Sequence, residues 1–282
     1  MIRRRAVAGV SLLCALAFCA FAAQSASAQI GTKAKNTTAF TCVNLGPKEG
    51  DFKDAHCDEK VASKTGEFAH ELISLNTTTE LTVTNNETAN KTEAAASITF
   101  RTTVAGVLSE ITCKKATTEG ATNPSVIHNV ESEAKTHTVT GTLEMLISEC
   151  EVKKPAKCVV KEPIVLKALF EGVEELGPGK DTHGIEFKAD PVSEKAPLTS
   201  IVMANKGAEK CPLNGIAVEI FGTMIATGTP NAKEKHSGAT TVFEPGNEMQ
   251  TLTAGGKPAE FSATFTTRMF GKGLPISFTT VT

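Results

Sequence analysis

The feature that most constrains the fold of this chain is the alternation of apolar and polar residues along threonine-rich segments. In residues 79–85, Leu81 and Val83 fall on one face of an extended chain, whereas Thr82 and Thr84 fall on the other. β-Branched residues in this pattern suit a half-buried, pleated surface, and clusters of Gly, Pro and Asn separate one run from the next. The same pattern recurs in residues 97–115, 136–152, 216–228, 260–270 and 274–282.

Helical periodicity, by contrast, is scarce. The segment KALFEGVEEL (167–176) is the best candidate for a short helix, which Gly177-Pro178 would end. A parallel sheet requires long crossover helices, and the sequence offers none. We therefore predict an all-β protein: an antiparallel β-sandwich or a barrel-like sheet with few or no helices apart from a signal peptide.

The N-terminus predicts export. Residues 3–5 are three arginines, residues 6–23 form an uncharged apolar run, and Ala26-Ser27-Ala28 matches a signal-peptidase site. Cleavage is therefore expected before Gln29. Since no second apolar stretch approaches membrane-spanning length, we expect no membrane span in the mature chain. The predicted location is the extracellular space or the cell envelope, as a secreted protein.

The mature chain would have about 254 residues, which is long for one average domain but ordinary for an all-β domain. No long Gly/Ser or Pro linker divides it, and its first part is the most polar. We predict three regions in the full chain: a signal peptide (1–28), a disulfide-tied N-terminal extension (29–63) and a main β-domain (64–282).

Six of the eight cysteines remain after removal of the signal peptide. An even number in an exported chain predicts three disulfides, although six cysteines allow 15 connectivities and the sequence does not choose among them. Separation along the chain ranks the pair Cys42 and Cys57 first. The pair Cys150 and Cys158, which surrounds a predicted hairpin tip at Pro155, comes second. The remaining pair, Cys113 and Cys211, follows by elimination.

The stretch DFKDAHCDEK (51–60) raises the question of a cation site. The paired ligand spacings of zinc sites are missing, and so is the alternating Asp/Asn pattern of a calcium loop. We interpret the stretch as a solvated acidic loop whose Cys57 is in a disulfide. The alternative is a calcium-dependent adhesion module in which Asp51, Asp54 and Asp58 meet a cation together with backbone carbonyls. No metal ligand or cofactor is assigned.

A second acidic stretch, EGVEELGPGKDTHGIE (171–186), suggests an alternative function as a secreted hydrolase. Paired carboxylates about 5–10 Å apart would suit glycoside hydrolysis. That chemistry usually needs aromatic rings to hold the sugar, and the chain has no Trp and no Tyr. No catalytic motif is present, so we expect no enzymatic activity. The titratable residues of the stretch are Glu171, Glu174, Glu175, Asp181, His183 and Glu186.

Charge and composition narrow the class of partner. The formal net charge is −2, and loss of the three leader arginines brings it to about −5. Nucleic acid and anionic membranes need clustered positive charge, so neither is expected as a partner. We expect an exported, non-enzymatic binding or structural protein with a partner in the cell envelope or the extracellular space.

Five segments, which include most of the cysteines, carry a resemblance to known proteins: FTCVNLGPKEGDFKDAHC, SEITCKKATTEG, LISECEVKKPAKCVV, GIEFKAD and FEPGNEMQTLTAGGKPAEFSATF. In this order they resemble a group of uncharacterised exported bacterial proteins, which share a signal peptide, an F-x-C opening and a Thr-rich β body. The likeness spans most of the mature chain. It implies a bacterial source and transfers no functional residue. The chain departs from the pattern where Cys211-Pro212 stands in place of Cys-Gly-Gly.

Overall fold

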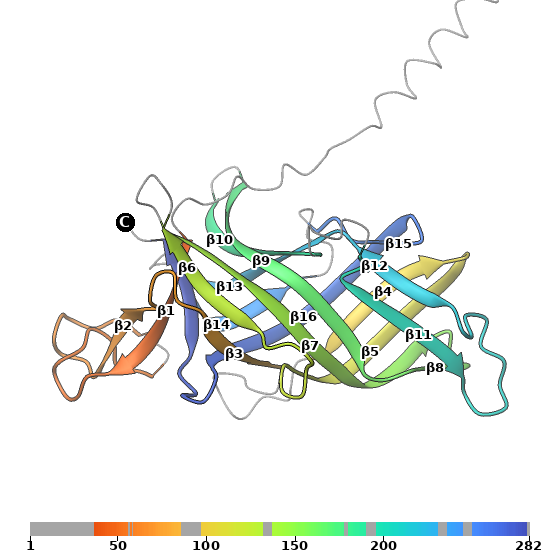
Figure 1. Cartoon of the computed structure of the whole chain (residues 1–282), viewed down its shortest axis with the longest axis horizontal. Coiled ribbons are helices and arrows are strands. Elements are labelled where there is room, and N and C mark those ends of the chain that lie inside the picture. Colours follow the sequence, from red (N-terminus) through yellow and green to blue (C-terminus); the bar gives the residue numbers. More distant parts are fainter. Residues whose placement is uncertain are drawn as a thin grey trace, which may run out of the picture. The chain divides into compact units, whose positions relative to one another are not determined.

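The computed structural model consists of antiparallel strands (Figure 1). It describes residues 37–55, 57, 59–85, 97–131, 137–177, 180–189, 196–230, 236–244 and 250–280. Within these ranges the chain has seventeen strands and no helix, so the all-β prediction is confirmed. Among the same residues there is accordingly no helix long and apolar enough to cross a bilayer. The predicted signal peptide, 1–28, lies outside the described residues.

The strands cover most of the described chain. Their bounds are β1 (Thr37–Asn44), β2 (Phe68–Leu72), β3 (Thr79–Thr84), β4 (Ile98–Val104), β5 (Val107–Thr117), β6 (Val126–Glu131), β7 (His137–Lys154), β8 (Cys158–Val160), β9 (Ile164–Gly177), β10 (Lys180–Lys188), β11 (Thr199–Asn205), β12 (Ala217–Phe221), β13 (Thr223–Pro230), β14 (His236–Phe243), β15 (Thr253–Ala254), β16 (Lys257–Met269) and β17 (Ile276–Thr280).

Antiparallel pairing joins these strands into a closed circuit. In chain order, β3 and β4 pair with β5 and β6, these pair with β7, β7 pairs with β9, and β9 pairs with β10 and β11. The circuit continues through β12 and β13, then β14 and β15, to β16, which pairs back with β3 and β4. Within the described residues the circuit has eight steps, each of which reverses the strand direction. The sheet is therefore barrel-like.

The strands of the circuit differ in continuity. β7, β9 and β16 run as long unbroken strands, whereas each other position is shared by two shorter strands in one line (Figure 1). Gly222 marks the break between β12 and β13 and has a φ of 107°. A Cβ atom at this position would lie 2.3 Å from the carbonyl oxygen of Thr251. Only glycine fits there without strain.

Side chains alternate between the interior and the outer face of the closed sheet. On β16, Phe261 and Phe265 are buried in the main core, whereas Glu260 and Ser262 are partly exposed. This is the period of two that the sequence predicts for a strand with one buried face. The interior is consequently apolar.

β1 lies across one end of the sheet, where it is close to β6, β7 and β9 and pairs with both β17 and β2. Asn129 of β6 ties it in place. The Asn129 Nδ2 donates to the carbonyl oxygens of Ala39 (3.0 Å) and Ile73 (2.8 Å), and its Oδ1 accepts from the Ala39 N–H at 2.8 Å. Asn129 has 0% exposure, so a single buried amide replaces the ladder bonds that β1 and β6 do not make with each other.

The predicted helix at 167–176 is wrong, because the segment belongs to β9. Ala168 and Phe170 are buried, Leu169 between them is partly exposed and Lys167 before them is exposed, as expected for a strand. In a segment this short, the apolar spacing fits a helix nearly as well as a strand. Pairing with β7 on one side and β10 on the other determines the outcome.

The six cysteines form three disulfides, as predicted. Cys42 is bonded to Cys57, the pair ranked first from the sequence. The other two predicted pairs, Cys150 with Cys158 and Cys113 with Cys211, are wrong. The bonds present are Cys113–Cys150, with Cα atoms 3.9 Å apart, and Cys158–Cys211, with Cα atoms 4.8 Å apart.

Strand register explains why these two disulfides form in place of the predicted pairs. Cys113 and Cys150 stand directly opposite each other on β5 and β7. Cys158 lies on β8, which pairs with the end of β11, and Cys211 follows in the next loop. The hairpin tip at Pro155 is present, but it separates two cysteines that face different partners.

The disulfide-bonded segment near the N-terminus has a small core of its own. Cys42, Cys57 and Phe52 are buried together, with Phe68 packed against them. Because β1 lies in this segment and also pairs with β17, the segment is joined to the sheet through backbone hydrogen bonds. The boundary between the extension (29–63) and the main domain (64–282) stays a prediction.

Candidate functional site

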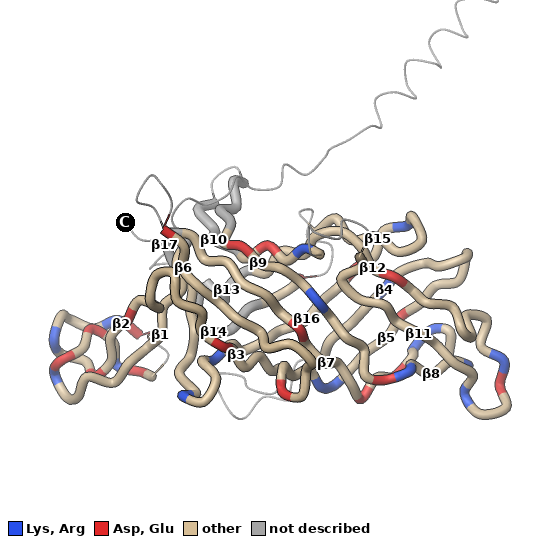
Figure 2. Tube along the Cα trace, viewed as in Figure 1, with Lys and Arg blue, Asp and Glu red and all other residues tan. Residues whose placement is uncertain are grey.

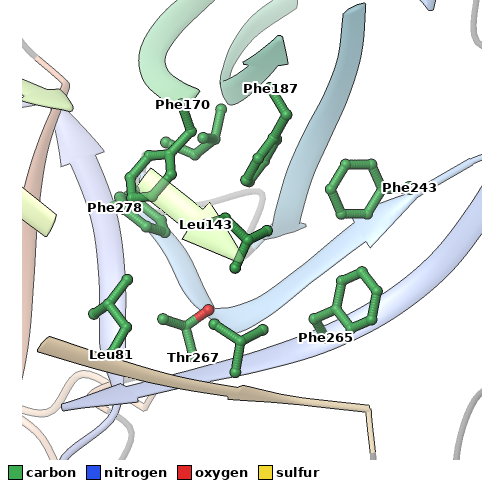
Figure 3. Close-up of a pocket in the computed structure, with 10 residues that line it drawn as sticks. Leu81, Leu143, Phe170, Phe187, Phe243, Phe265, Thr267 and Phe278 are labelled. Carbon is green, nitrogen blue, oxygen red and sulfur yellow. The ribbon is translucent and has the colours of Figure 1, made fainter. Parts of the chain in front are cut away.

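The interior of the closed sheet contains a cavity of about 30 Å³ at the end where β10 and β17 lie. Figure 3 shows side chains from opposite parts of the circuit converging on it. Nine of its ten lining side chains are hydrocarbon, and five of those nine are phenylalanine. The lining residues are Leu81, Val83, Leu143, Phe170, Ile185, Phe187, Phe243, Phe265, Thr267 and Phe278.

The strand alternation places these residues. Phe265 and Thr267 are two positions apart on β16, and so are Ile185 and Phe187 on β10. Members of each pair therefore point to the same face, and closure of the sheet turns that face inward. Because Phe has no polar atom, it can fill an interior without a hydrogen-bond partner, which Tyr or Trp would need. This explains why Phe is the only large aromatic residue type in the interior.

The rings form a continuous chain through the interior. The ring centroids of Phe170 and Phe187 are 5.5 Å apart, those of Phe187 and Phe243 are 5.3 Å apart, and those of Phe243 and Phe265 are 5.7 Å apart. Tilted and edge-to-face arrangements at these distances are favourable for aromatic pairs. The cavity is the space that these rings and the aliphatic side chains leave unfilled.

Gly141 on β7 is needed for the position of Phe170. The two residues are directly opposite each other on β7 and β9. A Cβ atom on Gly141 would lie 2.3 Å from the Phe170 ring and 2.1 Å from the Val126 carbonyl oxygen. The absence of a side chain at Gly141 therefore lets the Phe170 ring lie over the β7 backbone and border the cavity.

The size of the cavity limits what can enter it. A buried water needs roughly 10–15 Å³, and the engineered cavity that binds benzene in another protein measures roughly 150 Å³. At about 30 Å³, this cavity admits a group of a few heavy atoms. A larger ligand requires movement of the lining side chains. A cavity with apolar walls stays dry in the absence of a ligand, because a water molecule needs two to four polar partners.

The two described carboxylates of the predicted cation site each accept a hydrogen bond from a backbone N–H group of the same loop region. The Asp51 Oδ1 accepts from the Lys64 N–H at 3.0 Å, and the Asp54 Oδ2 accepts from the Glu59 N–H at 2.6 Å. The bond from the Lys64 N–H and one from the Ser63 hydroxyl lower the pKa of Asp51. Among the described residues no group of three or more His, Cys, Asp or Glu side chains is placed to hold a metal ion, while Asp58 lies outside the described residues.

The carboxylates of the predicted hydrolase site lie on a β9–β10 ladder. Glu171 is directly opposite Glu186, and both point to the outer face, since their neighbours Phe170 and Phe187 line the interior. The Lys188 Nζ lies 3.7 Å from the Glu171 carboxylate. The side chains of the other four candidates, Glu174, Glu175, Asp181 and His183, lie outside the described part of the chain.

Sequence reasoning missed one buried carboxylate, Glu144 on the outer face of β7. It accepts hydrogen bonds from the Thr122 N–H at 2.9 Å and from the Asn123 side chain, and the Lys167 Nζ lies 3.2 Å away. Burial raises the pKa of Glu144, but the bonds from Asn123, Lys167 and Thr122 outweigh it, and the resulting pKa is below its ordinary value. The carboxylate holds the loop between β5 and β6 against the sheet. Its place inside an alternating strand gave no signal of this role.

The loop anchor predicts a pH-dependent stability. Because the pKa of Glu144 is lower in the folded than in the unfolded chain, its contribution is present above the unfolded value of about 4.3 and is lost as the pH falls below it. We expect Glu144→Gln to cost about 2 kcal/mol at pH 7, and we expect the cost to shrink below pH 4. Urea unfolding of both proteins from pH 3 to 7 measures this. The exposed Glu219→Gln is the control, and a cost that does not shrink in acid contradicts the assignment.

The outer face of the described chain carries both signs of charge. Figure 2 shows Lys and Arg interspersed with Asp and Glu along strands and loops. Several of the charges are paired across strands, as Arg101 is with Glu260 at 3.7 Å. The main contrast in this molecule is therefore between a mixed, charged exterior and an apolar interior with an unfilled space.

The cavity depends on closure of the sheet and could not be located from residue spacing alone. The signal available in the sequence was the pair of phenylalanines in FSATF (261–265), four positions apart on one strand face. Comparisons with protein-family models, with curated proteins and with solved structures find no match. The cavity is therefore the feature from which a function is inferred.

Proposed function

We propose that this chain is an exported, non-enzymatic binding protein that holds the apolar group of a small ligand in the cavity inside its closed sheet. The observation that carries the proposal is the cavity wall, in which nine of ten side chains are hydrocarbon. Ligand sites in proteins are concave and mostly apolar, with a few polar groups. A closed sheet of eight strands has an interior that side chains fill or that holds one small ligand.

Two observations support the exported part of the proposal. Three disulfides are typical of a protein that folds in an oxidising compartment. The leader sequence at 1–28 has the charge, apolar run and cleavage motif of a signal peptide. Together they favour the extracellular space or the cell envelope as the place where the ligand is met.

The placement of the candidate carboxylates favours binding over hydrolysis. Glu171 and Glu186 lie on the outer face of the sheet, whereas the cavity is inside. A hydrolase of the type considered needs two carboxylates that face each other across a bound substrate. The one polar group in the cavity wall is the Thr267 hydroxyl, and the described residues of the wall include no His, Lys, Asp or Glu that could activate it as a nucleophile.

The test is binding of xenon, which enters apolar cavities whatever their natural ligand. The protein is recovered from outside the cytoplasm of a bacterial host, and its N-terminus is sequenced and expected to be Gln29. We expect a saturable ¹²⁹Xe chemical-shift change and a rise in melting temperature with hydrocarbons of up to about five heavy atoms, the larger of which require movement of the lining side chains. For these ligands we expect dissociation constants of about 1 mM or lower.

A pair of matched variants locates the binding. Val83→Leu adds one methylene group at the cavity wall, and we expect it to weaken xenon binding about tenfold or more, because little free volume remains. Val202→Leu makes the same change on β11, away from the cavity, and should bind as the wild type does. The proposal is wrong if Val83→Leu and the wild type bind xenon equally well. It is also wrong if the wild type does not bind xenon.

A further inference from the structure

Thr267 is the one polar side chain in the cavity wall. It lies on β16, two residues after Phe265, and its exposure is 6%. Figure 3 shows its hydroxyl oxygen on the side that faces Leu143. No hydrogen bond joins this hydroxyl to another of the described residues.

An unpaired hydroxyl in such a place is unfavourable. A hydroxyl removed from water without a new partner loses hydrogen bonds that nothing else in the site replaces. A water molecule would not be a stable partner for the hydroxyl, since a buried water needs two to four polar partners and the wall offers this single hydroxyl. A ligand with one polar atom and a hydrocarbon remainder would satisfy the hydroxyl without leaving polar groups of its own unpaired.

From this geometry we infer that the ligand is a small uncharged molecule with one oxygen function, such as a short branched alcohol, aldehyde or ketone, whose oxygen hydrogen-bonds to Thr267. The inference rests on the proposed function and specifies its ligand class. A Thr hydroxyl both donates and accepts, so it pairs with a carbonyl or with another hydroxyl. Ionised ligands are excluded, because the hydrocarbon wall cannot replace the hydration of a carboxylate or an ammonium group.

The chemical probes are isobutanol and isopentane, which have nearly the same shape and differ in a hydroxyl against a methyl group. Their affinities for the wild type and for Thr267→Val are measured by ¹³C methyl shift titration. Because water solvates the two probes differently, the informative quantity is the ratio of their affinities and its change between proteins. We expect Thr267→Val to lower the isobutanol-to-isopentane affinity ratio about tenfold, through loss of one hydrogen bond in an apolar site.

A second variant controls for shape. Thr267→Ser keeps the hydroxyl and loses a methyl group, which enlarges the cavity for both probes alike, so it should retain most of the wild-type affinity ratio. Thr267→Val keeps the β-branched shape that suits a strand and should fold, which its far-UV circular dichroism and xenon binding check.

The outcomes separate the two claims. If the wild type binds xenon and both probes, but Thr267→Val leaves their affinity ratio unchanged, the ligand class is wrong and the cavity function stands. If the wild type binds neither xenon nor either probe, the proposed function fails and the inference fails with it. A ratio that falls in Thr267→Val and is retained in Thr267→Ser supports both.

Discussion

Replacing Asn129 with leucine is expected to lower the free energy of unfolding by about 3 kcal/mol or more. The Asn129 amide is fully buried and bonds to the N–H of Ala39 and to the carbonyl oxygens of Ala39 and Ile73. The Ala39 oxygen has a second donor in the Ile73 N–H at 3.2 Å. Leucine would therefore leave the Ala39 N–H and the Ile73 oxygen unpaired, at roughly 1–3 kcal/mol for each buried group.

Denaturant unfolding of the purified protein measures the loss. Asn44→Leu is the matched control, since it removes an exposed side-chain bond to the Gly46 N–H and should cost less than about 1 kcal/mol. Hydrogen exchange gives a second readout: in Asn129→Leu the amides of β1 should exchange faster than those of β9. A loss below about 1 kcal/mol in Asn129→Leu would mean that the amide does not fasten β1 to the sheet.

The double replacement Cys158→Ala and Cys211→Ala is expected to lower the free energy of unfolding by about 4 kcal/mol. These cysteines are 53 positions apart, the largest separation among the three disulfides, and in the chain-entropy model the stabilisation grows with the length of the closed loop. Both residues are buried, so alanine keeps the site apolar and changes little else. The double replacement of Cys42 and Cys57, which are 15 positions apart, should cost about 3 kcal/mol.

Two measurements check this prediction. Guanidinium unfolding of the three oxidised proteins gives the order of stability, and a larger loss for the Cys42–Cys57 pair would contradict it. Peptide mapping without reduction gives the connectivity. A peptide that links Cys150 to Cys158 would refute the bonds of the structure and restore the pairing inferred from chain separation.

The fold class was predictable because its signal is local. Alternation in residues 79–85 and 260–270 depends on one strand and one buried face, and both segments are strands. The segment 167–176 was ambiguous for a physical reason: its ten residues fit two periods, and only the neighbouring strands β7 and β10 exclude the helix. Local propensity cannot anticipate such pairing.

The disulfides and the cavity required information of another kind. Proximity along the chain favoured Cys150 with Cys158, but β7 carries Cys150 past Cys113 before the chain turns at Pro155. The cavity is assembled from residues as distant as Leu81 and Phe278, which meet because the sheet closes. The single hydroxyl of Thr267 gains its significance from those neighbours, and a Thr in a Thr-rich strand carries no such mark by itself.

The way the sheet closes has a consequence for how the molecule is made. The seam joins β16 to β3 and β4, where Phe261 meets Phe100 and Thr266 meets Thr84. Every other pairing in the circuit links strands that follow one another in the sequence, so the sheet can grow strand by strand from the N-terminal side. Until Lys257 and the residues after it are available, the growing sheet has two unpaired edge strands, and its phenylalanine-bearing face is exposed to water. If the proposed export carries the chain across a membrane unfolded, the sheet can therefore close only when nearly all of the chain has crossed.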